Sequence, residues 1–305
     1  MDGPPHVAVV GSTASGKSSV ALEVARQLGD VDLVSVDSMQ VYREMDIGTA
    51  KPTTAERAAV RHHCLDLVDA TAEFTVAEFK PAFRSALQEI DAAGRRALLV
   101  GGTGLYHRVV IDDFDLPGRF PEVRDELEAE PVTERLHARL EALDPDAAAK
   151  MEPGNRRRVV RALEVTLGSG RRFSSFGPGV DAYPPSPVAQ IALRWPRTVI
   201  AERIERRVYE MIAAGLVEEV TRLHEAGMSR TAAQALGYKE IVSWIEGEMG
   251  KDEAIETIIT RTRQFAVRQE RWFRRDPRVR WYDVEHDPVA EVAPAVVAAL
   301  EESTT

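Results

Sequence analysis

Cysteine and long apolar runs are scarce in this sequence of 305 residues. Cys64 is the single cysteine, which excludes an intramolecular disulfide and a zinc site built from several cysteines. No apolar run is long enough to span a bilayer, and residues 1–6 lack the basic and apolar regions of a signal peptide. We therefore expect a cytoplasmic protein without a membrane partner.

Lysine is also scarce, with six Lys beside 33 Arg, and the net charge is −10. A negative total disfavours a nucleic-acid partner, but the total hides how the charges are distributed. Residues 155–172 contain six arginines and one acid, Glu164, and residues 261–280 contain eight arginines and two acids. The sequence therefore predicts local basic faces on an acidic body.

The apolar spacing predicts alternating strands and helices in the first third of the chain. A strand at 6–10, a glycine loop and a helix at 18–28 are followed by a strand at 31–36, a helix at 76–93 and a strand at 97–100. This alternation is typical of an α/β fold with a parallel sheet and helices on both faces. Its ligand is expected beyond the carboxyl ends of the strands, where Asp37 and Thr103 lie.

The pattern changes after residue 112. Residues 121–143 predict charged amphipathic helices, residues 155–167 predict a basic helix ended by Gly168, and residues 168–187 are rich in Gly, Ser and Pro. We expect 113–186 to be a smaller all-helical insertion in a core formed by 1–112 and 187–305. The rest of that core is predicted as strands at 188–194 and 279–282 and helices at 198–215, 217–227, 239–246 and 252–274.

A phosphate-loop motif, G-x-x-x-x-G-K-[ST], lies between the first strand and the first helix. Its glycines let backbone N–H groups and the helix N-terminus point at a phosphate, while the lysine adds charge and the last hydroxyl can hold Mg²⁺. A glycine-rich turn with an incidental lysine is the alternative. The motif does not distinguish ATP from a group carried on diphosphate. The residues predicted to bind a diphosphate are Gly11, Ser12, Thr13, Ala14, Ser15, Gly16, Lys17 and Ser18, with Ser18 as the Mg²⁺ ligand.

Together with this loop, several segments resemble the tRNA dimethylallyltransferases, also called tRNA isopentenyltransferases. They are Ser-Val-Asp37-Ser-Met-Gln-Val-Tyr, Asp46-Ile-Gly-Thr-Ala-Lys-Pro and Gly101-Gly-Thr-Gly-Leu-Tyr, and later 158–165, 203–207, 235–240 and 262–269. The resemblance covers nearly the whole chain in order. It implies an enzyme that moves the dimethylallyl group of dimethylallyl diphosphate to N6 of adenosine 37 in tRNA, with Mg²⁺ as cofactor. We expect the enzyme to be a monomer.

The resemblance also implies catalytic roles. Asp37 would hydrogen-bond N6 and accept its proton, although a turn cap or a Mg²⁺ ligand is the alternative reading. Arg207 would face the diphosphate together with Thr13 and stabilise the charge that grows on it. A solvated helix charge is the alternative for Arg207, and we expect its neighbours Arg203 and Arg206 at the surface.

Contacts with the tRNA anticodon stem-loop are implied for positions on the core and on the insertion. For the arginines the alternative is a solvated face, and for Thr103 a simple turn residue. The segment 262–269 as a whole is carried over, although Val267 stands where relatives often have lysine. The residues expected to contact tRNA are Asp37, Ser38, Met39, Gln40, Thr103, Arg124, Arg157, Arg158, Arg161, Gln234, Arg263 and Arg268.

Three other functions remain open from the residues themselves. A free-adenylate isopentenyltransferase shares the core but needs no basic insertion. A small-molecule kinase with ATP in the phosphate loop leaves the late basic helix and the turn at Gly101 unexplained. An RNA-binding GTPase-like module explains the arginines, but the guanine-selecting Asn-Lys-x-Asp is absent.

Overall fold

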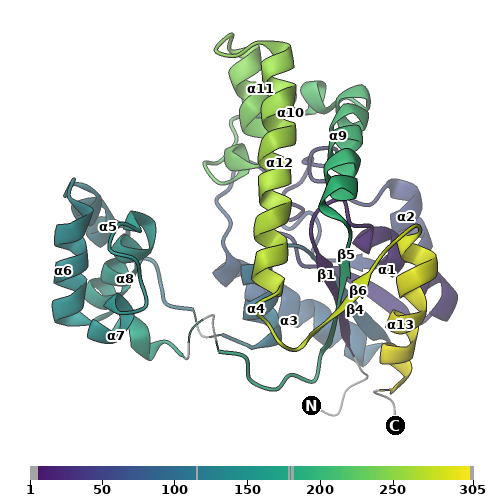
Figure 1. Ribbon diagram of the computed structural model, residues 1–305, viewed down its shortest axis with the longest axis horizontal. Coiled ribbons are helices and arrows are strands. Elements are labelled where there is room, and N and C mark those ends of the chain that lie inside the picture. The colour runs from purple at the N-terminus through teal and green to yellow at the C-terminus, as the bar shows by residue number, and fades with distance from the viewer. Residues whose placement is uncertain (1–5, 115, 178, 180–181, 303–305) are drawn as a thin grey trace. The chain divides into compact units, whose positions relative to one another are not determined.

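A computed structural model of the chain describes residues 6–114, 116–177, 179 and 182–302 (Figure 1). The chain divides into two compact units, which we call the core unit (Met1–Asp112 with Tyr183–Thr305) and the insertion unit (Asp113–Ala182). The core unit resumes at Tyr183 rather than at the expected residue 187. Its Tyr183 ring lies 4.4 Å from the Arg108 guanidinium, which attaches this segment to the core.

A parallel six-stranded sheet in the order β3-β2-β4-β1-β5-β6 forms the centre of the core unit. In the central strand β1, Val7 pairs with Leu98 of β4 and with Ala189 of β5. Both faces of β1 are buried, so it is apolar throughout instead of alternating with polar residues. The strands are β1 (Val7–Gly11), β2 (Val31–Ser35), β3 (His62–His63), β4 (Arg96–Gly101), β5 (Ala189–Arg194) and β6 (Val279–Asp283).

Helices cover both faces of this sheet (Figure 1). Val7 and Val9 of β1 pack with α1 and α13, whereas Ala8 and Val10 belong to the cluster that includes α3, α4 and α12. Alternate side chains of one strand therefore enter two cores, as the pleat of a strand requires. This arrangement confirms the predicted α/β fold. The helices are α1 (Lys17–Leu28), α2 (Thr54–Ala59), α3 (Val76–Ala92), α4 (Gly104–Ile111), α9 (Arg197–Ala213), α10 (Leu216–Ala226), α11 (Tyr238–Ile245), α12 (Lys251–Phe273) and α13 (Pro288–Glu302).

The insertion unit consists of helices around a small core of its own. Leu127, Leu136, Leu140 and Leu163 are buried together there, and each stabilises the fold by about 1.5–3 kcal/mol. The basic helix begins after Asn155, whose side chain accepts a hydrogen bond from the N–H of the third helical residue. The helices are α5 (Pro121–Glu128), α6 (Thr133–Leu143), α7 (Pro145–Ala148) and α8 (Arg156–Ser169).

One predicted helix end is wrong. Helix α8 continues through Gly168 and closes at Gly170, which adopts a left-handed φ of +68°. A Cβ at Gly168 would lie 2.1 Å from the Phe120 ring, so this glycine makes room for an aromatic neighbour. The sequence pattern also missed the helices α2, α4, α7 and α13 and the two-residue strand β3. Within the described ranges, no helix combines the length and the apolar character needed to cross a membrane.

Candidate active site

The phosphate-loop motif follows β1 and ends in the first turn of α1, as the sequence predicted. Gly11 and Gly16 have φ values of +138° and +96°, which L side chains rarely adopt. Gly16 precedes α1, so the N-terminus of that helix opens onto the loop, and Lys17 and the exposed Ser18 are its first residues. The helix dipole and the free N–H groups at this end favour an anion.

Two side chains from the region after β5 hold the loop from its other side. Trp195 Nε1 donates to the carbonyl oxygen of Ser15 at 2.9 Å, and Arg203 Nε donates to that of Ala14 at 2.7 Å. The Arg203 guanidinium stacks 4.7 Å from the Trp195 ring centroid. The expectation that Arg203 is a surface residue is therefore wrong, because its charged group supports the loop.

Two groups, Lys17 on the loop and Arg207 on α9, concentrate positive charge. Arg207 Nη1 lies 3.5 Å from Thr13 Oγ1, and Lys17 Nζ donates to the carbonyl oxygen of Ser12 at 2.6 Å. Burial and then the nearby Arg207 charge lower the pKa of Lys17 to about 7, and Asp37 opposes this shift. Burial likewise lowers the pKa of Arg207. Removing two cations from water is unfavourable, so this site gains stability when an anion arrives.

Asp37 comes directly after β2 and faces the same positive groups. Its Oδ1 accepts hydrogen bonds from the backbone N–H of Met39 at 2.8 Å and of Gln40 at 3.4 Å, so this oxygen caps its own turn. Oδ2 accepts no hydrogen bond from any residue that the structure describes. The turn-cap reading thus accounts for one oxygen and leaves the other available for chemistry.

Thr103 brings the turn after β4 against the turn after β2. Its Oγ1 accepts from the backbone N–H of Ser38 at 3.2 Å and lies 3.4 Å from the Ser38 hydroxyl. Strands β2 and β4 are neighbours, which is why two residues 65 positions apart meet at this edge. Thr103 is therefore more than a simple turn residue.

The phosphate loop, Asp37 and Arg207 line one cavity of about 450 Å³. Its charged lining includes Lys17, Asp37 and Arg207, and its apolar lining includes Leu22, Leu33, Leu65 and Phe265. A cavity with cations at one place, a carboxylate at another and apolar walls suits a ligand with a charged head and an apolar tail.

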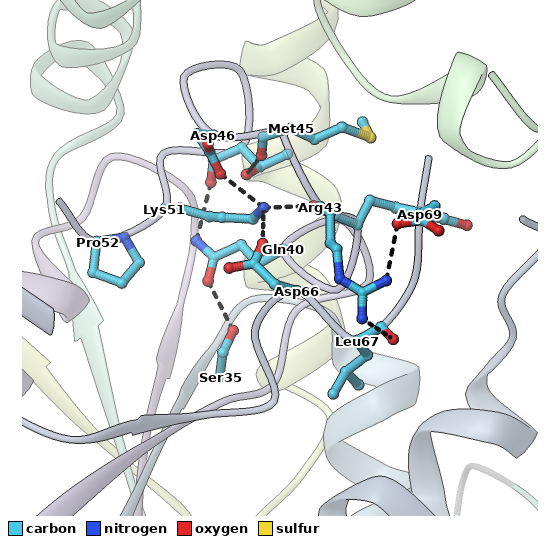
Figure 2. A network of polar contacts seen from close by, with 12 residues as sticks. Ser35, Gln40, Arg43, Met45, Asp46, Lys51, Pro52, Asp66, Leu67 and Asp69 are labelled. Carbon is cyan, nitrogen blue, oxygen red and sulfur yellow. Dashed lines mark hydrogen bonds and ion pairs between the residues drawn. The ribbon is translucent and has the colours of Figure 1, made fainter. Parts of the chain in front are cut away.

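The segment after Asp37 is fastened by buried polar contacts (Figure 2). Lys51 Nζ contacts the carbonyl oxygen of Tyr42 at 2.5 Å, Asp46 at 2.9 Å and Asp66 at 2.6 Å. Gln40 Nε2 donates to the carbonyl oxygens of residues 49 and 50, and its Oε1 accepts from the Ser35 hydroxyl. Both ends of the Gln40 amide are thus engaged within the protein, whereas the sequence suggested an RNA contact.

Glu219 on α10 is a functional residue that no sequence pattern indicated. Its carboxylate accepts three consecutive backbone N–H groups, from residues 46, 47 and 48, and the hydroxyl of Tyr238. A Cβ on Gly48 would lie 2.3 Å from the Tyr238 ring. Tyr238 lies in the segment 235–240 that carries the family resemblance, but nothing in that segment indicates that Glu219 is its hydrogen-bond partner. Glu219 therefore fixes the wall of the cavity from a distant helix.

Comparison with known proteins identifies the family. The family model for IPP transferase matches residues 40–276. The chain is 45% identical over 300 residues to a tRNA dimethylallyltransferase of Paenarthrobacter aurescens, covering 97% of this chain and 96% of that protein. It is 48% identical over 289 residues to one of Kineococcus radiotolerans, covering 91% and 90%. The chain belongs to the IPP transferase family.

Solved structures of this family share the fold. A tRNA isopentenylpyrophosphate transferase of Bacillus halodurans has a TM-score of 0.71 and 38% identity, with 98% of each chain covered. A eukaryotic dimethylallyltransferase acting on tRNA has a TM-score of 0.80 and 25% identity, covering 96% of this chain and 78% of that one. The alternatives of a kinase and a GTPase-like module are not favoured.

Within this IPP transferase, the basic residues expected to meet RNA fall into two groups. On the insertion unit, Arg157 and Arg158 are exposed on α8. Arg161 instead donates to Glu164 and to the Pro117 carbonyl oxygen, both at 2.8 Å. Arg124 pairs with Glu128 at 2.9 Å and, more loosely, with Glu164. The structure therefore presents Arg157 and Arg158 outward and uses Arg161 and Arg124 within the unit.

On the core unit, the expected RNA residues outside the turns that carry Asp37 and Thr103 lie on α12 and in the turn before α11. Gln234 and Arg268 are exposed, whereas Arg263 donates to Glu205 at 2.6 Å and lies near the Ala201 carbonyl oxygen. Met39 is partly exposed beside Asp37.

A metal ion has few protein ligands available. No group of three or more His, Cys, Asp or Glu side chains with metal-binding geometry occurs among the described residues. The exposed hydroxyl of Ser18 at the start of α1 fits Mg²⁺ shared with a diphosphate, because Mg²⁺ keeps most of its waters and needs few protein ligands.

Proposed function

We propose that the chain transfers the dimethylallyl group of dimethylallyl diphosphate to N6 of adenosine 37 in tRNA and releases diphosphate. Membership of the IPP transferase family supports the reaction class. The observation that carries the assignment of roles is Asp37, which lines the same cavity as the phosphate loop and Arg207 and whose Oδ2 accepts no hydrogen bond from the described residues. A base and an anion-binding loop in one cavity suit an amine attacking a carbon that bears a diphosphate.

The proposed step is a substitution at the first carbon of the dimethylallyl group. The N6 lone pair forms the new C–N bond, and the C–O bond breaks with its electron pair on the diphosphate. The N6 proton moves to Asp37 Oδ2, so the product is a neutral alkylated amine. Asp37 Oδ1 stays bonded to the turn, which keeps the second oxygen directed at the nucleophile.

The leaving diphosphate gains negative charge as the C–O bond breaks. Lys17, Arg207 and the N-terminus of α1 are placed to stabilise that charge, and Thr13 would add a hydroxyl donor. When bound, Mg²⁺ would neutralise part of the diphosphate charge, held by Ser18 and the phosphate oxygens.

The acceptor base must leave its stack before N6 is accessible. Exposed Arg157 and Arg158 on the insertion unit and exposed Arg268 on the core unit would hold phosphates of the anticodon stem-loop. Thr103 and Ser38, joined beside Asp37, would contact the extruded adenosine.

The test is incubation with unmodified tRNA, dimethylallyl diphosphate and Mg²⁺, followed by mass analysis of the nucleosides. We expect adenosine to gain a five-carbon alkenyl group. Parallel reactions offer AMP as acceptor and ATP as donor. Alkylation of AMP in preference to tRNA would replace the proposal by the free-adenylate reaction, and phosphate transfer from ATP with unmodified tRNA would replace it by a kinase.

A further inference from the structure

Gln269 joins two walls of the cavity. It lies on α12 and is buried, with 6% of its surface exposed. Its Oε1 accepts from the backbone N–H of Thr13 at 2.8 Å, and its Nε2 donates to the carbonyl oxygen of Gly102 at 2.9 Å. Thr13 belongs to the phosphate loop and Gly102 to the turn that carries Thr103. A single amide therefore spans the two loops, and both of its polar ends are engaged within the protein, whereas the segment 262–269 suggested an RNA contact.

The glycines of the turn after β4 make room for this side chain. A Cβ on Gly102 would lie 2.3 Å from Gln269 Nε2, and a Cβ on Gly104 would lie 2.1 Å from the Trp272 ring. Neither glycine has a positive φ, so backbone conformation does not require glycine at these two positions. The close approach of the Gln269 and Trp272 side chains requires it. The Gly-Gly-Thr-Gly turn is thus the surface on which α12 docks.

One of the two Gln269 hydrogen bonds holds the loop on the diphosphate side of the proposed reaction, and the other holds the turn on the adenosine side. Thr13, held through its N–H, presents Oγ1 to Arg207 on the diphosphate side. Gly102, held through its carbonyl, precedes Thr103, whose hydroxyl bonds Ser38 beside Asp37 on the adenosine side. A shift of either loop would change the separation between the donor carbon and N6.

We propose that Gln269 is a positioning residue that sets the phosphate loop and the Thr103 turn at the separation the transfer step requires. The inference rests on the proposed function. Reacting atoms must lie about 3–3.5 Å apart, and an error of about 1 Å can cost on the order of a hundredfold in rate. Because both polar ends of the Gln269 amide are engaged by backbone groups of the two loops, its loss should affect turnover more than binding.

The test variant is Gln269→Met, which keeps the length of the side chain and removes both hydrogen bonds. With tRNA and dimethylallyl diphosphate we expect kcat to fall between about tenfold and a hundredfold. The KM values for tRNA and for the donor should stay within about threefold. An unchanged kcat, or a loss confined to KM, would overturn the proposal.

Two control variants separate positioning from stability. Gln88→Met makes the same substitution at an exposed position of α3 and should leave kcat unchanged. Phe83→Leu weakens the buried core beneath α3 and should lower Tm while kcat at a temperature well below Tm is retained. If Phe83→Leu lowered kcat as much as Gln269→Met at equal loss of Tm, the effect would be structural and the proposal wrong.

A double-mutant cycle tests the bridge itself, and its Gly102→Ala arm tests the bridge even if Gln269→Met folds poorly. Gly102→Ala forces the Gln269 amide away from the turn, so it should lower kcat on its own. Combined with Gln269→Met it should cost little more than the worse single variant, because both changes break one bridge. Fully multiplicative effects would contradict the proposal. Wild-type enzyme that alkylates no tRNA would instead refute the proposed function.

Discussion

Asp37 divides its two oxygens between structure and chemistry. Asp37 lines the cavity; its Oδ1 caps the turn through Met39 and Gln40, while its Oδ2 accepts no hydrogen bond from the described residues. Asparagine in place of Asp37 keeps an oxygen for the turn but cannot accept a proton. We expect Asp37→Asn to lower kcat on the order of a hundredfold or more in steady-state assays, with both KM values nearly unchanged. A raised KM with wild-type kcat would restrict Asp37 to binding.

Lys17 makes donor binding depend on pH. Burial and Arg207 lower its pKa to about 7, against the opposing charge of Asp37, and a bound diphosphate would raise this pKa again. Above pH 7 the free enzyme must therefore take up a proton when the donor binds. We expect the donor affinity to fall between about pH 7 and pH 9, by at most about tenfold per pH unit. Calorimetry in buffers of different ionisation enthalpy measures the proton uptake.

Lys17→Arg is the matched control for this titration, because arginine stays charged over the whole range. The variant should bind the donor with little pH dependence between pH 7 and 9 and with no proton uptake. If wild type and variant showed the same pH dependence, Lys17 would not be the group that titrates.

At the scale of elements, helix α8 shows that a basic run is not uniform. Arg157 and Arg158 are exposed, but Arg161 is bound to Glu164 and the Pro117 carbonyl oxygen. We expect Arg157→Ala with Arg158→Ala to weaken tRNA binding and to lower the slope of log affinity against log salt by about one to two. Filter binding at several salt concentrations measures this slope.

Arg161→Ala should act differently. It removes the closer of the two arginines that pair with the buried Glu164, so the insertion unit should lose about 1–3 kcal/mol of stability while the salt slope changes little. The variant that removes both Arg157 and Arg158 has a charge-matched control, Arg135→Ala with Arg139→Ala, which removes two exposed charges from α6. If the salt slope fell equally in that control, Arg157 and Arg158 would not be specific tRNA contacts, and α8 would be only one of several solvated basic faces.

At the scale of the whole molecule, the chain leaves the core unit and returns to it at the same place. Arg278 Nη1 donates to Asp112 and to the Pro184 carbonyl oxygen, both at 2.6 Å, so the two ends of the insertion leave the core beside one guanidinium. A short glycine linker could therefore replace Asp113–Ala182. We expect the shortened protein to fold, to be protected thermally by dimethylallyl diphosphate with Mg²⁺, and to bind tRNA far more weakly.

A thermal shift assay with both ligands checks this expectation. ATP should protect the full chain and the shortened chain only weakly, through its phosphates, because the leucines of the cavity lining suit a short apolar tail. Full retention of tRNA binding by the shortened protein would contradict the role proposed for the insertion unit. Lys17→Ala should abolish protection by either ligand.

The fold and the two reactant loops were predictable from sequence because their signals are local. Strand β1, the phosphate loop and α1 are contiguous, and each strand that delivers Asp37 or Thr103 is a short apolar run. Since parallel strands end at one edge, their following residues meet without further information. The use of glycine as a sign of a helix end failed at Gly168, where the Phe120 ring requires a residue without Cβ.

The links between those loops were decided only by tertiary structure. Gln269 reaches Thr13 across 256 residues, Glu219 reaches the backbone at Asp46 across 173, and Arg203 reaches Ala14 across 189. In the sequence these are ordinary polar residues of amphipathic helices, because hydrophobic spacing says which face of a helix is buried but not which backbone groups that face will meet. Their partners are set by how α9, α10 and α12 pack against the sheet.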